Sequence, residues 1–87
     1  MKLLIVEDNL SVRRVLKTIV APFADEILEC GGGGDAVRIY RAEKPEIVLM
    51  DINLGDTDGI EATRRIRRFD ARARVVIVTS CDEPDLR

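Results

Sequence analysis

Residues 46–54 have the sequence Glu46-Ile47-Val48-Leu49-Met50-Asp51-Ile52-Asn53-Leu54, a short aliphatic run that ends on a carboxylate. Apolar side chains follow one another here without alternation, which is typical of a central parallel strand covered by helices on both faces. Asp51 therefore falls at the carboxyl end of a buried strand. Ligands bind at that edge of open α/β sheets, because loops from several strands meet there. We therefore ask which other residues the fold brings to Asp51.

Size and composition favour one small α/β domain. The chain has 87 residues, and its apolar content is aliphatic, with only one tyrosine and two phenylalanines. Its 14 basic and 16 acidic residues nearly balance, so composition gives no reason to expect direct binding to nucleic acid. No apolar run approaches the roughly 20 residues of a membrane span, and the N-terminus lacks the pattern of a secretory signal. We expect a cytoplasmic protein that does not enter a membrane.

The cysteines and the lack of histidine narrow the chemistry. Cys30 and Cys81 have no metal-ligand spacing, and we expect them to be small buried apolar residues that stay reduced. The chain contains no histidine. Ser/His/Asp hydrolysis, histidine-bound metals and a phosphohistidine on this chain are therefore excluded.

Strands and helices alternate along the rest of the chain. Further strands are predicted at residues 2–6, 25–30 and 75–78, and helices after Asn9 or Ser11, from Asp35 to Lys44, and from about Ile60 to Phe69. The side chains expected to face inward are Val12, Val15, Leu16, Ile19, Val20 and Phe23 in the first helix, Ala36, Val37, Ile39 and Tyr40 in the second, and Ile60, Thr63 and Ile66 in the third. This alternation predicts a doubly wound parallel α/β sheet.

Two stretches have more than one interpretation. Gly31 to Gly34 invites a phosphate-loop interpretation but lacks the Lys-Ser/Thr of a P-loop, so a flexible connection explains it better. The third helix and the turn after it are rich in arginine, at Arg64, Arg65, Arg67, Arg68, Arg72 and Arg74. Such a run is most often a solvated helix face, and the alternative is a docking patch for an acidic partner.

Polar residues follow three of the predicted strands. Glu7 and Asp8 come after the first, Asp51 ends the third, and Thr79 follows the fourth. Parallel strands put these ends at one edge, where carboxylates about 4 Å apart would repel by ~4 kcal/mol per pair at an effective dielectric near 20. Protonation or a divalent cation would offset this, and oxygen ligands suit Mg²⁺ better than zinc. The alternative is that these acids only cap helices or are solvated.

The whole chain resembles the receiver domain of two-component response regulators. The motifs that carry the resemblance are Leu3-Leu4-Ile5-Val6-Glu7-Asp8-Asn9, the stretch from Lys44-Pro45 to Leu54, Asp58-Gly59-Ile60-Glu61, and Val75-Val76-Ile77-Val78-Thr79-Ser80. The resemblance implies a flavodoxin-like sheet with strand order 2-1-3-4. It also implies that residues 1–87 form a single receiver domain that is incomplete at the C-terminus and ends before the family's fifth strand. The family's lysine on that strand would then be absent, and Gly55 stands where the family usually has proline.

The resemblance also implies roles for individual residues. Asp51 would accept a phosphoryl group from the phosphohistidine of a histidine kinase or phosphotransfer protein. Asp8, Asp51 and the Asn53 carbonyl would bind Mg²⁺ directly, and Glu7 would contact the metal through a water molecule. The Thr79 hydroxyl and the Ser80 N–H would bind the phosphoryl group. Asn53 and Cys81 would flank the entrance for the attacking water. Such a domain is a signalling module with weak chemistry of its own and no external substrate.

Three further expectations remain open. A magnesium-dependent phosphohydrolase of the aspartyl-phosphate type is disfavoured. In that family the nucleophile lies on the first strand, and a second aspartate follows two residues later. Here the candidate nucleophile ends the third strand, and the residue two positions later, at position 53, is asparagine. A receiver that acts only as an interaction module is the other alternative. Finally, an uncovered sheet face and an aliphatic edge strand at Val75 to Val78 predict a homodimer.

Overall fold

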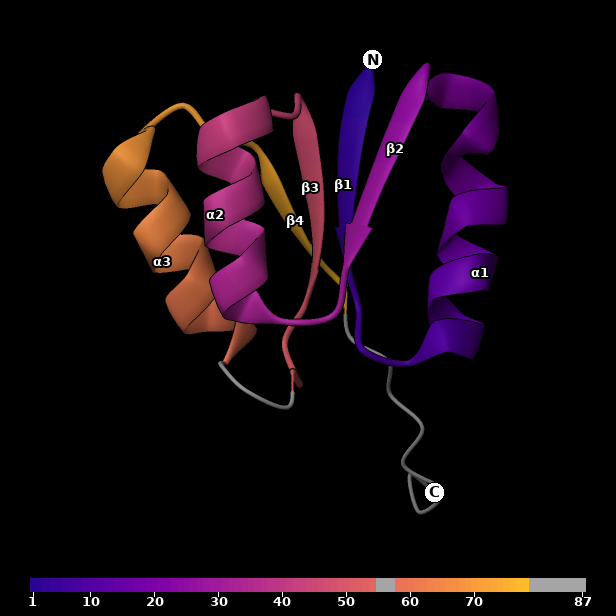
Figure 1. Ribbon diagram of the computed structural model, residues 1–87, viewed down its shortest axis with the longest axis horizontal. Coiled ribbons are helices and arrows are strands. Elements are labelled where there is room, and N and C mark those ends of the chain that lie inside the picture. Colours follow the sequence, from indigo (N-terminus) through magenta and orange to yellow (C-terminus); the bar gives the residue numbers. More distant parts are fainter. Residues whose placement is uncertain (55–57, 79–87) are drawn as a thin grey trace.

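The computed structural model describes residues 1–54 and 58–78, which form a parallel sheet with helices on both faces (Figure 1). The strands are β1 (Lys2–Val6), β2 (Glu26–Cys30), β3 (Ile47–Asp51) and β4 (Val75–Val78). The helices are α1 (Leu10–Val20), α2 (Gly33–Glu43) and α3 (Gly59–Phe69), with a short 3-10 turn, η1 (Ala21–Phe23), after α1. The sheet order is β2-β1-β3-β4 with every pair parallel. The predicted fold class and strand order are confirmed.

The sheet is covered unequally on its two faces. Helices α2 and α3 lie side by side on one face, and α1 lies on the other (Figure 1). The main apolar cluster consists of Leu4, Val6, Cys30, Ala36, Tyr40, Val48, Met50, Ala62, Ile66 and Ala73. These residues come mostly from β1, β3, α2 and α3, so the core is concentrated between the sheet and the α2–α3 layer. Cys30 is buried, as predicted, whereas Cys81 lies outside the described residues.

Helix α1 differs most from its prediction. The Asn9 side chain caps it by accepting hydrogen bonds from the N–H groups of Ser11 and Val12, which decides between the two expected caps. None of its residues is buried, however, and Val15, Ile19 and Phe23 of the expected inner stripe are 58, 59 and 69% exposed. The apolar arc of the helix is wider than the strip that contacts the sheet, so only part of it is covered.

The starts of α2 and α3 also need correction. Helix α2 begins at Gly33 rather than Asp35, because Gly32 serves as its N-cap and accepts a hydrogen bond from the Ala36 N–H at 3.0 Å. In α3, Ile66 is buried as expected, but Ile60 is 38% exposed, and the small residues Gly59 and Ala62 are buried. Asp58 caps α3 through a hydrogen bond from the Ile60 N–H.

No helix within residues 1–54 and 58–78 has both the length and the apolar character needed to cross a membrane.

Candidate functional site

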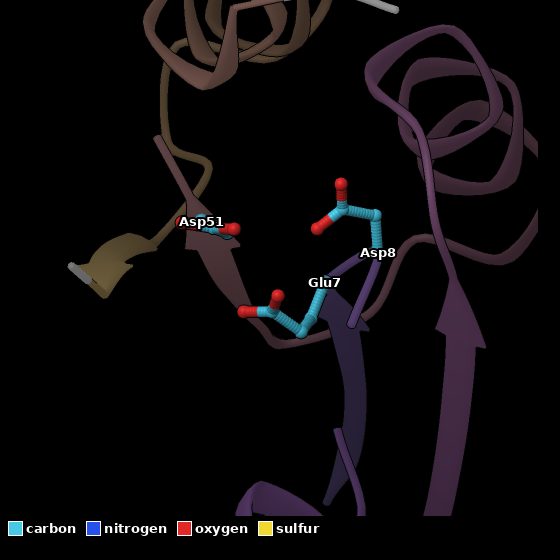
Figure 2. Close-up of side chains that lie close together, drawn as sticks. All are labelled: Glu7, Asp8 and Asp51. Atoms are coloured by element: carbon cyan, nitrogen blue, oxygen red, sulfur yellow. The ribbon is translucent and has the colours of Figure 1, made fainter. Parts of the chain in front are cut away.

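Three carboxylates meet at the carboxyl edge of the sheet. Glu7 and Asp8 directly follow β1, and Asp51 is the last residue of β3, the neighbouring strand. One carboxylate oxygen from each residue lies within 4.8 Å of those of the other two. Figure 2 shows the three side chains directed into the same space. The parallel topology thus brings together residues that are more than forty positions apart in the chain.

The environments of these acids differ. Glu7 and Asp51 are each only 2% exposed, whereas Asp8 is exposed. Glu7 Oε2 accepts a hydrogen bond from the Asn9 N–H at 3.1 Å, but Glu7 Oε1 is buried and has no hydrogen-bond partner within the described residues. Burial raises the pKa of Glu7, the nearby Asp51 adds to the increase, and the hydrogen bond from Asn9 opposes it. The cluster therefore holds one buried carboxylate oxygen, Glu7 Oε1, that no group within residues 1–54 and 58–78 satisfies.

Hydrogen bonds fix the backbone around the cluster. Asp51 Oδ1 accepts a hydrogen bond from the Asn53 N–H at 3.2 Å, which links the acid to the loop after β3. Arg13 in α1 donates two hydrogen bonds to the Glu7 carbonyl oxygen, from Nε at 3.0 Å and Nη2 at 2.8 Å. The Arg13 guanidinium passes close to Gly31, where a Cβ would lie 3.1 Å from Nη2. Arg13 thus holds the end of β1 in place.

Gly59, at the start of α3, packs directly on the strand that carries Asp51. Its N–H donates to the Ile52 carbonyl at 3.0 Å, and a Cβ at position 59 would lie 2.1 Å from the Asp51 carbonyl oxygen. No side chain fits there without moving backbone. Gly59 belongs to one of the family motifs in the sequence, but the motif alone gave it no packing role, and the sequence pattern assigned no role to Arg13. Both roles depend on how the chain folds back between a strand and the helix that follows it.

Of the other predicted site residues, the structure describes only Asn53. Asn53 is exposed, and its described contact to the site is the backbone hydrogen bond to Asp51. Thr79, Ser80 and Cys81 lie outside the described residues.

The cluster fits a hard divalent cation. All three side chains offer oxygen only, and carboxylate oxygens are the ligands that Mg²⁺ prefers in proteins. Glu7 Oε1, which has no partner in the part of the chain that the structure describes, supplies further negative charge that a cation or its bound water would satisfy. A carboxylate held beside such a cation can act as a nucleophile toward a phosphoryl group.

Comparisons with known proteins agree with this arrangement. The family model of the response regulator receiver domain matches residues 3–87. The chemotaxis protein CheY of Halobacterium salinarum is 34% identical over 84 residues, covering 97% of this chain and 70% of that protein. The sporulation initiation phosphotransferase F of Bacillus subtilis is 32% identical over 85 residues, covering 98% of this chain and 68% of that protein.

A solved structure shows the same likeness. The CheX–CheY complex with BeF3 and Mg²⁺ from Borrelia burgdorferi matches with a TM-score of 0.81 at 28% identity, covering 91% of this chain and 61% of that one. The chain thus spans about two thirds of the length of the relatives it matches. With its parallel sheet in the order β2-β1-β3-β4, this chain belongs to the family of response regulator receiver domains, the signalling domains of two-component phosphorelay systems.

Proposed function

We propose that Asp51 is the phosphoacceptor of this receiver domain. The observation that carries the proposal is the convergence of Asp51 with Glu7 and Asp8 at the carboxyl edge of the sheet. The donor is the phosphohistidine of a histidine kinase or phosphotransfer protein. An Asp51 carboxylate oxygen attacks phosphorus, a P–O bond forms, the P–N bond breaks, and its electron pair returns to the imidazole nitrogen, which then takes up a proton.

Glu7, Asp8 and Asp51 would hold magnesium in this proposal. When bound, the ion neutralises charge on the transferring phosphoryl group and offsets the repulsion among the acids. Glu7 and Asp51, both nearly fully buried, fix two carboxylates in position, and exposed Asp8 leaves the site open to the donor. The Mg²⁺ and BeF3 named for the Borrelia CheX–CheY complex support this cofactor. By resemblance, the Asn53 carbonyl is a further metal ligand, and Thr79 and Ser80 bind the phosphoryl group.

Signalling rather than turnover of an external substrate is the proposed activity, and the cytoplasm is its proposed location. The family match supports both points. A phosphohydrolase stays the weaker alternative, because the position two residues after Asp51 carries Asn53, whose amide is exposed and supplies no second acid.

A transfer assay tests the proposal. Purified chain is mixed with a phosphorylated histidine phosphotransfer protein, with magnesium or with a chelator. We expect label to move to the wild-type chain in magnesium, to remain on the donor with chelator, and to remain there for Asp51→Asn. Asp25→Asn is the matched control, because Asp25 lies at the opposite edge of the sheet, just before β2. Transfer to Asp51→Asn at the wild-type rate would overturn the assignment.

We also propose that two copies of the chain associate through apolar surface beside α1 and β4. Val15, Ile19 and Phe23 are more than half exposed, and Val76 of β4 is 50% exposed. Within the described residues β4 pairs only with β3, so its outer edge carries free backbone groups that favour pairing. Light scattering on the 87-residue chain should give the mass of a dimer at tens of micromolar. A stable monomer would contradict this.

A further inference from the structure

Charge is distributed unevenly in this chain. The α2–α3 layer, taken as residues 33–44 and 59–74, contains nine basic and four acidic side chains. The rest of the chain contains five basic and twelve acidic ones, so the layer carries a net charge of +5 in a chain whose total is −2. This layer lies on the face of the sheet opposite α1 (Figure 1). An acidic protein thus presents one distinctly basic face.

A shallow, open groove lies along α2 on this face, and α3 contributes one of its lining residues. It has a volume of about 540 Å³ and is lined by Gly34, Val37, Arg38, Arg41, Ala42 and Arg65. Two small apolar side chains thus lie among three guanidinium groups. Arg38 and Arg41 are separated by three positions on α2, and carboxylates one turn apart on a facing helix have the same spacing.

The groove arginines have only weak partners. Arg38 pairs with Asp35 three positions earlier, and Arg65 pairs with Glu61 four positions earlier at 3.3 Å. Glu61 also forms an ion pair with Arg64 at 3.5 Å, so two arginines share one carboxylate. Exposed ion pairs of this kind contribute little to stability, so a carboxylate from a partner can replace them at small cost.

Arg41 is positioned differently. Its guanidinium carbon lies 5.3 Å from the centre of the ring of Phe69, the last residue of α3. This cation–π contact orients the guanidinium, and within residues 1–54 and 58–78 its N–H groups remain available to donate hydrogen bonds to an anionic partner.

We propose that the α2–α3 groove is a docking site for an acidic helical segment of a partner protein. Carboxylates on the segment bind Arg38, Arg41 and Arg65, and one or two small apolar side chains contact Val37 and Ala42. The apolar side chains of Val37 and Ala42 between the guanidinium groups favour a protein segment over nucleic acid, whose phosphates require no apolar contact. This surface is separate from the acidic cluster at Asp51, so its test does not depend on the phosphoacceptor role.

A peptide probe tests the proposal. The probe is a fluorescent helical peptide of about 20 residues with glutamates along one face and leucine and alanine beside them. Anisotropy titrations compare the wild-type chain with Arg38→Glu/Arg65→Glu. The matched control is Arg14→Glu/Lys17→Glu, which makes the same charge change on α1, on the other face of the sheet. Circular dichroism confirms that each variant is folded.

We expect the groove variant to bind the probe about tenfold or more weakly and the α1 variant to bind within about twofold of wild type. Amide chemical-shift changes caused by the probe should be confined to α2 and α3. No binding at micromolar concentrations, or equal weakening in both variants, would overturn the proposal. Tighter binding of a single-stranded oligonucleotide that the same groove variant abolishes would also overturn it.

Discussion

Replacing Glu7 by glutamine should stabilise the metal-free protein and reduce its response to magnesium. Glutamine has nearly the same shape but removes one charge, and its amide can donate a hydrogen bond where Glu7 Oε1 has no partner within the described residues. One carboxylate oxygen from each of Glu7, Asp8 and Asp51 lies within 4.8 Å of those of the other two. Two unit charges at that separation repel by about 3.5 kcal/mol at an effective dielectric near 20.

Solvent at exposed Asp8 and proton uptake by the cluster reduce this repulsion, so we expect Glu7→Gln to gain about 1 to 3 kcal/mol without metal. For a domain of this size, such a gain raises Tm by about 4 °C or more. Magnesium should stabilise the wild-type chain by ~2.7 kcal/mol at a hundredfold excess over Kd, and the variant by less. Glu7→Gln should thus increase the stability of the metal-free protein but decrease the stabilisation by magnesium. These opposite changes distinguish a metal site from a general improvement in packing.

Thermal melts with millimolar magnesium and with chelator measure both effects. Glu26→Gln, at the start of β2, is the control and should respond to magnesium as the wild type does. If Glu7→Gln melts below the wild type in chelator, or gains as much from magnesium as the wild type, the three acids do not form a strained metal site.

Two further substitutions test packing and hydrogen bonding. Gly59→Ala places a Cβ 2.1 Å from the Asp51 carbonyl oxygen. We expect it to lower the free energy of unfolding, measured with urea, by about 1–3 kcal/mol and to slow phosphorylation of Asp51. A variant as stable as the wild type would contradict that close approach. The Tyr40 hydroxyl donates to Asp70 Oδ2 at 2.8 Å; this bond lowers the pKa of Asp70, whereas burial and Asp70 together raise the pKa of Tyr40 to about 12. The contribution of the Asp70 carboxylate to stability is present above its ordinary pKa of 3.8 and is lost as pH falls through the lowered pKa. The contribution of the Tyr40 hydroxyl is present below pH 10 and is lost as pH rises toward 12. Unfolding measured across pH should therefore show a flatter profile for Tyr40→Phe at both extremes, and an unchanged profile would refute the coupling.

The sequence was sufficient to predict the sheet and the convergence of the acids. β1 has the predicted bounds, Lys2–Val6, and Asp51 ends β3 as expected. Both predictions depend on a local property, an aliphatic run that stops at a charge. The meeting of Glu7, Asp8 and Asp51 then follows from topology alone, because parallel strands end at the same edge.

The helix faces were harder to predict, because periodicity shows which residues are apolar and not how much of the arc a neighbour covers. Val15 and Ile19 belong to the apolar stripe of α1, yet they are more than half exposed, since the sheet contacts only part of that arc. The roles of Arg13 and Gly59 were also missed. Each depends on a close approach to a backbone carbonyl across a strand-to-helix connection, and the periodicity of the sequence does not specify that contact.

Phosphorylation of Asp51 is the central claim, and intact mass spectrometry tests it most directly. The chain is incubated with a small phosphodonor such as acetyl phosphate, with magnesium or with chelator, alongside Asp51→Asn and the control Asp25→Asn. We expect the wild type and the control to gain the mass of one phosphoryl group in magnesium only, and Asp51→Asn to gain none. An equal gain by Asp51→Asn would contradict the claim and place the acceptor on another residue.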